Sequence, residues 1–302
     1  MTEPRLVEPL ARQGPGRIPE GLVEALDLVV ARRVGGALPG DRLGSGVGSG
    51  TEIAQLRPYE VGDDVRQIDA AATARTGEPH VRTHVPERTL TTWVVVDVSP
   101  SMAFGTADRL KSDVAEGVAQ VVGRLAVRRA GRVALMTFGD GRPRLLRPHA
   151  SRPGIVAIRR ALGEGVVPDG RADPGALSTA LVRLMKVAKQ AGLVVIVSDF
   201  RDQDGWTRPL GALSARHSVL AVEVRDPREG ELPDAGQLAL VDPESGELIH
   251  VDTSRRRVRR RFAELEAERR GHVARELRRL RVEHAVVSTE GDWLRQLGRR
   301  LR

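Results

Sequence analysis

The chain has 302 residues, 40% of them hydrophobic and 29% charged, a composition typical of one large or two modest globular domains. It contains no cysteine, which excludes disulfides, thiol catalysis and cysteine-based zinc sites. No apolar run approaches the roughly 18 residues that span a membrane. The N-terminus lacks the pattern of a signal peptide, so we expect a cytoplasmic protein.

The formal net charge of +8 raises the question of nucleic-acid binding. Nearly all of the positive charge is arginine, because lysine occurs only at Lys111, Lys186 and Lys189. Aromatic residues make up 3% of the chain and include one tyrosine, which leaves little material for stacking on bases. Nucleic-acid binding is therefore an alternative that rests on charge alone, which favours non-specific contacts.

Apolar strand patterns alternate with amphipathic helix patterns from residue 91 onward. Before them, helical spacing covers 21–34, and a Gly/Ser-rich loop without a phosphate-binding G-K-[ST] ending covers 38–52. We predict strands at 91–98, 132–138, 143–149, 192–200, 218–226 and 283–289. We predict helices at 107–130, 152–162, 174–190, 207–215, 254–281 and 291–301, and a hairpin at 236–252 with its turn at 243–246.

Several of these strands are apolar throughout, so they need cover on both faces. Because helices separate them, the pattern implies βαβ crossovers. We therefore predict an α/β fold for 91–302, with a doubly wound, mostly parallel sheet flanked by helices, preceded by an N-terminal extension over 1–90. Ligands of such sheets bind outside the carboxyl ends of the strands, at the switch point of strand order.

Polar side chains stand where two of the predicted strands end. Asp97, Ser99 and Ser101 alternate after the first strand, and Asp199 follows the strand that begins at 192. One such residue is well explained as a helix cap, but three at alternate positions are not. Mg²⁺ prefers oxygen ligands in octahedral array and keeps several waters. Two hydroxyls with one or two carboxylates therefore predict a divalent-cation site.

The D-x-S-x-S loop and the later aspartate resemble the metal-ion-dependent adhesion site of von Willebrand factor A domains. That resemblance implies the same doubly wound sheet, bound Mg²⁺ or Mn²⁺, and a partner carboxylate that completes the coordination. It assigns Asp97, Ser99, Ser101 and Asp199 to the metal.

The threonine loop of such sites is not matched in this sequence. In "RADPGALSTAL" (171–181), Gly175 occupies the position of the threonine, and Thr179 lies four positions too late. Asp173 is the candidate substitute ligand. The resemblance therefore implies a degenerate site with one ligand missing or replaced.

Two further segments resemble the signatures of one particular family. "LRPYEVGDDVRQIDAAATARTGEPHVRTH" (56–84) and "EVRDPREGELPDAGQLALVDPESGE" (223–247) resemble signatures of the bacterial family called Domain of Unknown Function 58. The resemblance covers about 40–300, and Ala70 departs from it where a tryptophan is usual. It implies pairing with a MoxR-type AAA+ ATPase, with the chain acting as an adaptor or co-chaperone toward a client protein.

Charges of opposite sign alternate closely within the first of these segments. They either pair with one another and dock the N-terminal region on the sheet domain, which such spacing favours, or form a partner-binding or second metal surface. The candidate residues are Arg57, Tyr59, Gly62, Asp63, Asp64, Arg66, Asp69 and Arg75.

The enzymatic alternative is a phosphatase of the haloacid dehalogenase type, which also places an aspartate nucleophile after a buried strand. Its loop needs a second acid where Ser99 stands, and a lysine before the later acidic pair, for which Lys186 and Lys189 are poorly spaced. The sequence shows no Ser-His-Asp pattern. We therefore expect a non-catalytic protein-interaction module.

Overall fold

The computed structural model of the chain describes residues 11–27, 53–84, 90–140, 143–170, 172–202 and 205–300. These residues fall into two compact units, one of 11–27 with 90–300 and one of 53–84. The expected division placed all of 1–90 in one extension, whereas residues 11–27 belong to the sheet unit. The predicted loop at 38–52 lies outside the described residues.

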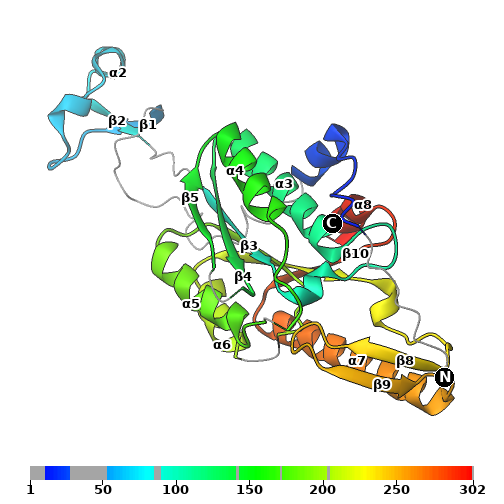
Figure 1. The fold of residues 1–302 in the computed structure, drawn as a ribbon. Helices are drawn as coiled ribbons and strands as arrows, with labels where there is room; N and C mark the ends of the chain where they lie inside the picture. Colours follow the sequence, from blue (N-terminus) through cyan, green and yellow to red (C-terminus); the bar gives the residue numbers. More distant parts are fainter. Residues whose placement is uncertain are drawn as a thin grey trace. The chain divides into compact units, whose positions relative to one another are not determined.

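Six strands form the sheet of the larger unit, in the order β10-β7-β6-β3-β4-β5 (Figure 1). All are parallel except β5, which joins the edge antiparallel to β4. The strands are β3 (Thr91–Asp97), β4 (Arg132–Phe138), β5 (Leu145–His149), β6 (Leu193–Ser198), β7 (Ser218–Arg225) and β10 (Glu283–Ser288). The predicted doubly wound, mostly parallel sheet is confirmed, and its switch point lies between β3 and β6.

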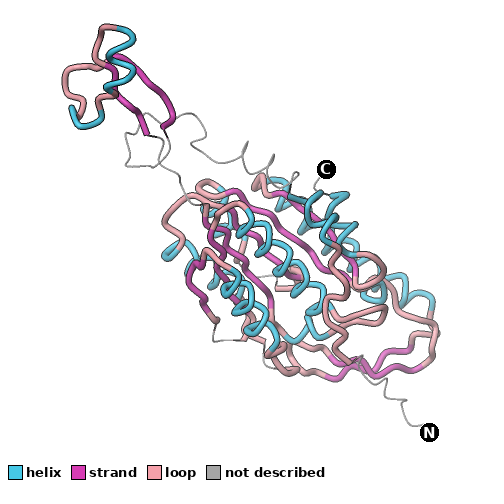
Figure 2. Tube along the Cα trace, turned by 90° about the horizontal axis from the view of Figure 1, so that it is seen from above, coloured by secondary structure: helices cyan, strands magenta, loops and turns pink. Residues whose placement is uncertain are grey.

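Helices cover both faces of this sheet, as Figure 2 shows. One face carries α3 (Lys111–Arg128), α4 (Arg152–Gly163) and α8 (Trp293–Arg300). The other carries α5 (Ala176–Val187), α6 (Thr207–Ser214) and α7 (Arg256–Arg279). Along β3, Val94 and Val96 enter the first core and Trp93 and Val95 the second, because successive side chains of a strand point to opposite faces. Double cover explains why the strand is apolar throughout.

No described helix has the length and apolar character needed to cross a membrane.

The N-terminal segment 11–27 packs on the face that carries α3 and α8. It is helical over 20–27, where Val23 and Leu26 join the buried core of that face. The indole Nε1 of Trp293 donates a hydrogen bond to the carbonyl of Pro15 at 3.0 Å. Burial of apolar side chains and of an indole with its partner accounts for the segment belonging to the sheet unit.

Two smaller pieces complete the fold. The predicted hairpin is confirmed as β8 (Gln237–Val241) and β9 (Leu248–Asp252), joined through 243–246. The separate 53–84 unit pairs β1 (Ile53–Pro58) antiparallel with β2 (His80–His84). The connection between them contains a 3₁₀ turn, η1 (Val65–Gln67), and the helix α2 (Ala70–Thr76).

Candidate functional site

The structure brings the polar ends of β3 and β6 together at the switch point. These strands are hydrogen-bonded neighbours, so Asp97 lies beside Ser198, whose hydroxyl donates to Asp97 Oδ2 at 2.5 Å. Asp199 follows directly, and the two aspartates are 4% and 2% exposed. Sequence reasoning placed both carboxylates at one sheet edge, and the structure has them there.

The D-x-S-x-S loop is a tight turn that leads into η2 (Pro100–Ala103). The backbone N–H of Ser99 donates to Asp97 Oδ1 at 2.9 Å, and the hydroxyls of Ser99 and Ser101 lie 3.1 Å apart. Gly139, at the end of β4, allows this approach: a Cβ there would lie 2.6 Å from the Ser99 nitrogen, and its φ is +105°. The loop is thus held with the hydroxyls of Ser99 and Ser101 in contact with each other.

Asp97 is a buried carboxylate without a cationic partner among the described residues. Burial, followed by the nearby charge of Asp199, raises the pKa of Asp97 to about 7. Hydrogen bonds from Ser198 and Ser99 act in the opposite direction but do not cancel the increase. A buried anion of this kind is costly unless a positive charge is close.

Lys111, the first residue of α3, supplies positive charge to the other aspartate. Its side chain is fully buried, and its Nζ donates to Asp199 Oδ2 at 2.6 Å and to Glu229. Burial opposes the charged amine, but the two carboxylates raise the pKa of Lys111 overall, and the pKa of Asp199 is lowered. Arg201 adds weaker charge, 3.8 Å from the same oxygen.

Lys111 and Glu229 were missed as site residues in the sequence analysis. The lysine heads an amphipathic helix, where a surface position is the ordinary expectation. Glu229 ends a 3₁₀ turn, η3 (Pro227–Glu229), within the segment that resembles the family signature. The usable signal was the rarity of lysine in an arginine-rich chain.

Gly175, at the position where the resemblance expects a threonine, is the N-cap residue of α5. Gly175 caps α5, and its N–H donates to Asp202 Oδ1 at 3.1 Å, while the N–H of Leu177 donates to Asp202 Oδ2 at 3.1 Å. Asp173, the candidate substitute ligand, is exposed, and its backbone carbonyl accepts from Ala176. Asp202 therefore does the capping, and nothing in the described contacts joins the Asp173 side chain to the D-x-S-x-S loop.

A further carboxylate reaches the loop from the β8–β9 hairpin. Glu244 Oε1 accepts a hydrogen bond from the backbone N–H of Ser101 at 3.1 Å. Partial burial, and then the charges of Asp199 and Asp242, raise the pKa of Glu244 above its ordinary value, against the hydrogen bonds from Ser101. Sequence reasoning predicted the hairpin and its turn at 243–246 but not this contact, because no local pattern shows which part of the fold a hairpin turn will reach.

The donor set fits a hard divalent cation. In an octahedron with ligands at about 2.1 Å, neighbouring oxygens are about 3 Å apart, close to the spacing of the Ser99 and Ser101 hydroxyls. The unpaired charge of Asp97 supplies the electrostatic reason for a cation. No three His, Asp or Glu side chains in the described ranges form a metal cluster by themselves, so such a site depends on the serines.

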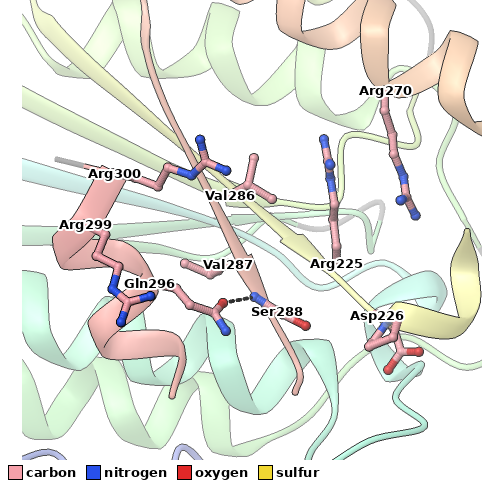
Figure 3. Close-up of a pocket in the computed structure, with 10 residues that line it drawn as sticks. Arg225, Asp226, Arg270, Val286, Val287, Ser288, Gln296, Arg299 and Arg300 are labelled. Carbon is pink, nitrogen blue, oxygen red and sulfur yellow. Dashed lines mark hydrogen bonds between the residues drawn. The ribbon is translucent and has the colours of Figure 1, made fainter. Parts of the chain in front are cut away.

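At the carboxyl ends of β7 and β10, the same edge of the sheet carries arginine side chains. A pocket of about 580 Å³ opens there between α7 and α8, and Figure 3 shows the arginines that line it. Arg225 is bound by Glu223, and Arg270 by Glu266, whereas Arg299 and Arg300 have no ion pair within the described part of the chain.

The acids beside this pocket are fully paired. Asp226 is 1% exposed and accepts from the backbone and hydroxyl of Thr106, the hydroxyl of Thr289 and the backbone of Arg228, at 2.6–2.9 Å. Although burial opposes it, these bonds hold the pKa of Asp226 below its ordinary value. The pocket therefore presents an excess of positive charge.

In the 53–84 unit, the predicted signature residues pair locally. Arg57 makes two bonds to Asp63, at 2.6 and 2.8 Å, and the arginine lowers the pKa of that carboxyl. Asp64 caps η1 through the N–H of Arg66. Asp69 caps α2 and binds Arg82 at 2.6 Å.

The remaining signature residues serve the backbone or face solvent. Tyr59 donates its N–H to the carbonyl of Pro79, and Gly62 has a positive φ in the turn before η1. Arg66 and Arg75 are exposed. Internal pairing accounts for the three aspartates, and docking of this segment on the sheet unit stays a prediction.

Comparison with known proteins places the chain in one family. The family described as protein of unknown function DUF58 matches residues 55–272. An uncharacterized protein of Mycobacterium tuberculosis is 38% identical over 280 residues, covering 92% of this chain and 87% of the relative. An uncharacterized protein of Mycobacterium avium is 41% identical over 125 residues, covering 41% of this chain and 73% of that protein.

Solved structures with similar folds were also found. A conserved hypothetical protein, BatB of Bacteroides thetaiotaomicron, aligns with a TM-score of 0.43 at 13% identity, covering 70% of this chain and 97% of that one. The SpRpn10 VWA domain aligns with a TM-score of 0.32 at 13% identity, covering 45% and 75%. The strand order itself carries the assignment of the fold.

Proposed function

Because the chain belongs to the DUF58 family and has a von Willebrand factor A-like sheet, we propose that it is a non-catalytic module that binds a protein partner at the carboxyl edge of that sheet. The observation that carries the proposal is the grouping of two serine hydroxyls and two buried carboxylates at the switch point. A cytoplasmic location is part of the proposal.

In this proposal Asp97, Ser99, Ser101 and Asp199 hold Mg²⁺ or Mn²⁺. The bound cation supplies positive charge that a carboxylate of the partner can bind. The chain's own residues orient the site: Ser198 fixes Asp97, and Lys111 fixes Asp199. The Ser99 hydroxyl lies next to that of Ser101, and both can turn toward a cation.

The proposed partner is a MoxR-type AAA+ ATPase, with the chain acting as its adaptor or co-chaperone toward a client. This choice rests on the family resemblance, since no contact in the molecule identifies a partner. The signature unit 53–84 is a second candidate contact surface, because Leu56, Val61, Val65 and Ile68 are between 38% and 101% exposed there.

Two other functions have less support. A phosphatase needs a lysine free to hold the phosphoryl group, but the Nζ of Lys111 is enclosed and bonded to two carboxylates of its own chain. A nucleic-acid binder would use the arginine-lined pocket at β7 and β10. The support for this function is the positive charge of the pocket alone.

Isothermal titration with Mg²⁺ and with Mn²⁺ tests the site. We expect saturable binding by the wild type, none by Asp97→Ala, and unchanged binding by Asp234→Ala, which alters an exposed aspartate elsewhere on the unit. A wild type that binds neither ion reduces the D-x-S-x-S loop to a capping structure.

Capture by the ATPase tests the partner. We expect the immobilised chain to retain the purified MoxR-type ATPase in Mg²⁺ and to lose it in EDTA or with Asp97→Ala. Salt-sensitive binding of DNA without capture of the ATPase would favour the nucleic-acid alternative.

A further inference from the structure

The tip of the β8–β9 hairpin is seated on the sheet unit beside the D-x-S-x-S loop. The backbone N–H of Gly170 donates to the carbonyl of Pro243 at 2.8 Å. A Cβ at Gly170 would lie 3.5 Å from Gly246, and a Cβ at Gly246 would lie 3.3 Å from Gly170. Both glycines have φ of +73°, which other residues adopt at a cost. The segment at Gly170 and the hairpin turn thus meet through bare backbone, which leaves no room for a side chain between them.

The turn itself aims Glu244 at the loop. Asp242 accepts from the N–H of Glu244 at 3.0 Å and from the hydroxyl of Ser245 at 2.8 Å, which closes the turn. The side chain of Glu244 then reaches back to the N–H of Ser101 at 3.1 Å. A glutamate of an exposed hairpin is in this way half-buried next to a proposed metal ligand.

The charge around Glu244 is unfavourable as it stands. Among the described residues the side chain of Glu244 makes no ion pair with an arginine or lysine, and its carboxylate is held against the loop by the Ser101 N–H. Asp97, the acid of the D-x-S-x-S loop, likewise has no cationic partner among the described residues, while Lys111 is occupied by Asp199 and Glu229. Two carboxylates, one within the loop and one hydrogen-bonded to it from the hairpin, therefore have no ion pair with a cation of the protein among the described residues.

The ligand position that the threonine loop fails to fill has no side chain of its own. Gly175 presents only backbone, its N–H is taken by Asp202, and Asp173 is exposed. We propose that Glu244 is the carboxylate ligand that the chain itself supplies to the divalent cation at the D-x-S-x-S loop. The inference rests on the proposed metal site and goes beyond it, because it makes the β8–β9 hairpin part of that site.

One consequence concerns the partner. A carboxylate of the chain already stands at the loop, so a partner's carboxylate has to bind beside Glu244 or displace it. The hairpin and the cation are then thermodynamically coupled: metal binding holds the hairpin tip, and removal of the metal loosens it.

Titration with Mn²⁺ alone tests this ligand. The variant Glu244→Gln keeps the size of the side chain and an oxygen for the Ser101 N–H, but removes the charge. We expect the dissociation constant for Mn²⁺ to rise about tenfold or more, as loss of a charged ligand predicts. Glu247→Gln is the matched control, since Glu247 is in the same connection, is exposed, and should leave the constant unchanged.

Hydrogen exchange gives a second readout that does not depend on affinity. Mn²⁺ should slow amide exchange in 241–248 of the wild type and of Glu247→Gln, but not of Glu244→Gln under conditions where the variant is loaded. Circular dichroism establishes that all three proteins are folded.

The outcomes separate the inference from the proposed function. If the wild type binds Mn²⁺ and Glu244→Gln binds within twofold of it, Glu244 is not a ligand and the four-residue site stands. If Mn²⁺ binds without slowing exchange in the hairpin, the coupling is also refuted. If the wild type does not bind Mn²⁺ at all, the metal site and the inference fall together.

Discussion

The two ends of the sheet's carboxyl edge differ in one buried acid, Asp97, which has no cationic partner among the described residues, whereas Asp199 beside it is paired with Lys111. Beside β7 and β10, Asp226 is surrounded by four donors and Glu223 by the guanidinium of Arg225 and the ring of His284. At β3 and β6, Asp97 is equally buried but receives only hydroxyl and backbone donors. Asp226 and Glu223 have lowered pKa values, whereas the pKa of Asp97 is raised.

This difference separates buried acids that the chain neutralises by itself from Asp97, which it does not neutralise. A buried carboxylate that the chain neutralises by itself contributes to stability and needs nothing from outside. A buried carboxylate without a nearby cation lowers the stability of the fold. A cation bound from outside would offset that loss, so such a carboxylate is a candidate binding group. Substitutions at both kinds of acid, and at the groups that neutralise them, test this contrast.

The largest effect is expected from Lys111→Met. It removes the cation that Asp199 and Glu229 share in the core and leaves both acids buried without it. Breaking a buried ion pair from one side costs about 3–5 kcal/mol of unfolding free energy. Urea unfolding followed by circular dichroism measures it, and Lys189→Met, at an exposed lysine, should cost less than about 0.5 kcal/mol. A loss below 1 kcal/mol for Lys111→Met would show that the enclosed lysine is not required.

A smaller loss is expected from Asp226→Ala. The change leaves the hydroxyls of Thr106 and Thr289 and two backbone N–H groups without their acceptor. At about 1 kcal/mol per hydrogen bond, partly recovered by water, the unfolding free energy should fall by about 2–3 kcal/mol. Mn²⁺ affinity should stay within twofold of wild type, because Asp226 belongs to the paired end of the edge. A large loss of affinity would remove the distinction between the two ends.

Acid should weaken the paired end next. The lowered pKa values of Asp226 and Glu223 mean that both contribute stability above their unfolded values, about 4 to 4.5, and lose it as the pH falls through their folded values. The urea midpoint should therefore fall progressively below about pH 4.5. In Asp226→Asn, which no longer titrates, the fall should be shallower; an identical slope would contradict the assignment of Asp226.

The smallest effect is expected from Asp173→Ala. Its side chain is exposed, and the described contacts do not join it to the loop, so the affinity for Mn²⁺ should change by less than twofold. Isothermal titration beside Asp97→Asn, which should lose binding, measures the contrast. A tenfold loss in Asp173→Ala would return this residue to the site as the substitute for the threonine and would compete with Glu244 for that role.

Local pattern was enough for the elements and for part of the site. The strand predicted at 132–138 coincides with β4, and the hairpin turn was placed correctly, because apolar runs and Pro-Gly punctuation act over a few residues. Asp97 and Asp199 were recognisable because each directly follows an apolar run. They were expected at one edge of the sheet because the carboxyl ends of parallel strands lie at the same edge.

The predicted helix at 107–130 shows the limit of such patterns. It begins at Lys111, because the N–H of that residue is taken by the carbonyl of Phe104 and the preceding residues form a loop. In that position the lysine side chain enters the core beside Asp199. Sequence periodicity cannot distinguish an ammonium that is exposed at a helix start from one that is buried there.

The sequence by itself indicated that Asp97 and Asp199 would lie at one edge of the sheet, because the carboxyl ends of parallel strands share an edge; that β3 and β6 are neighbours was decided by the tertiary structure. Tertiary structure alone decided which acids are neutralised, because Lys111, Glu229 and Glu244 arrive through loops whose paths depend on packing far from the site. Charge compensation depends on distances of a few ångströms between distant segments, and a linear pattern does not contain those distances.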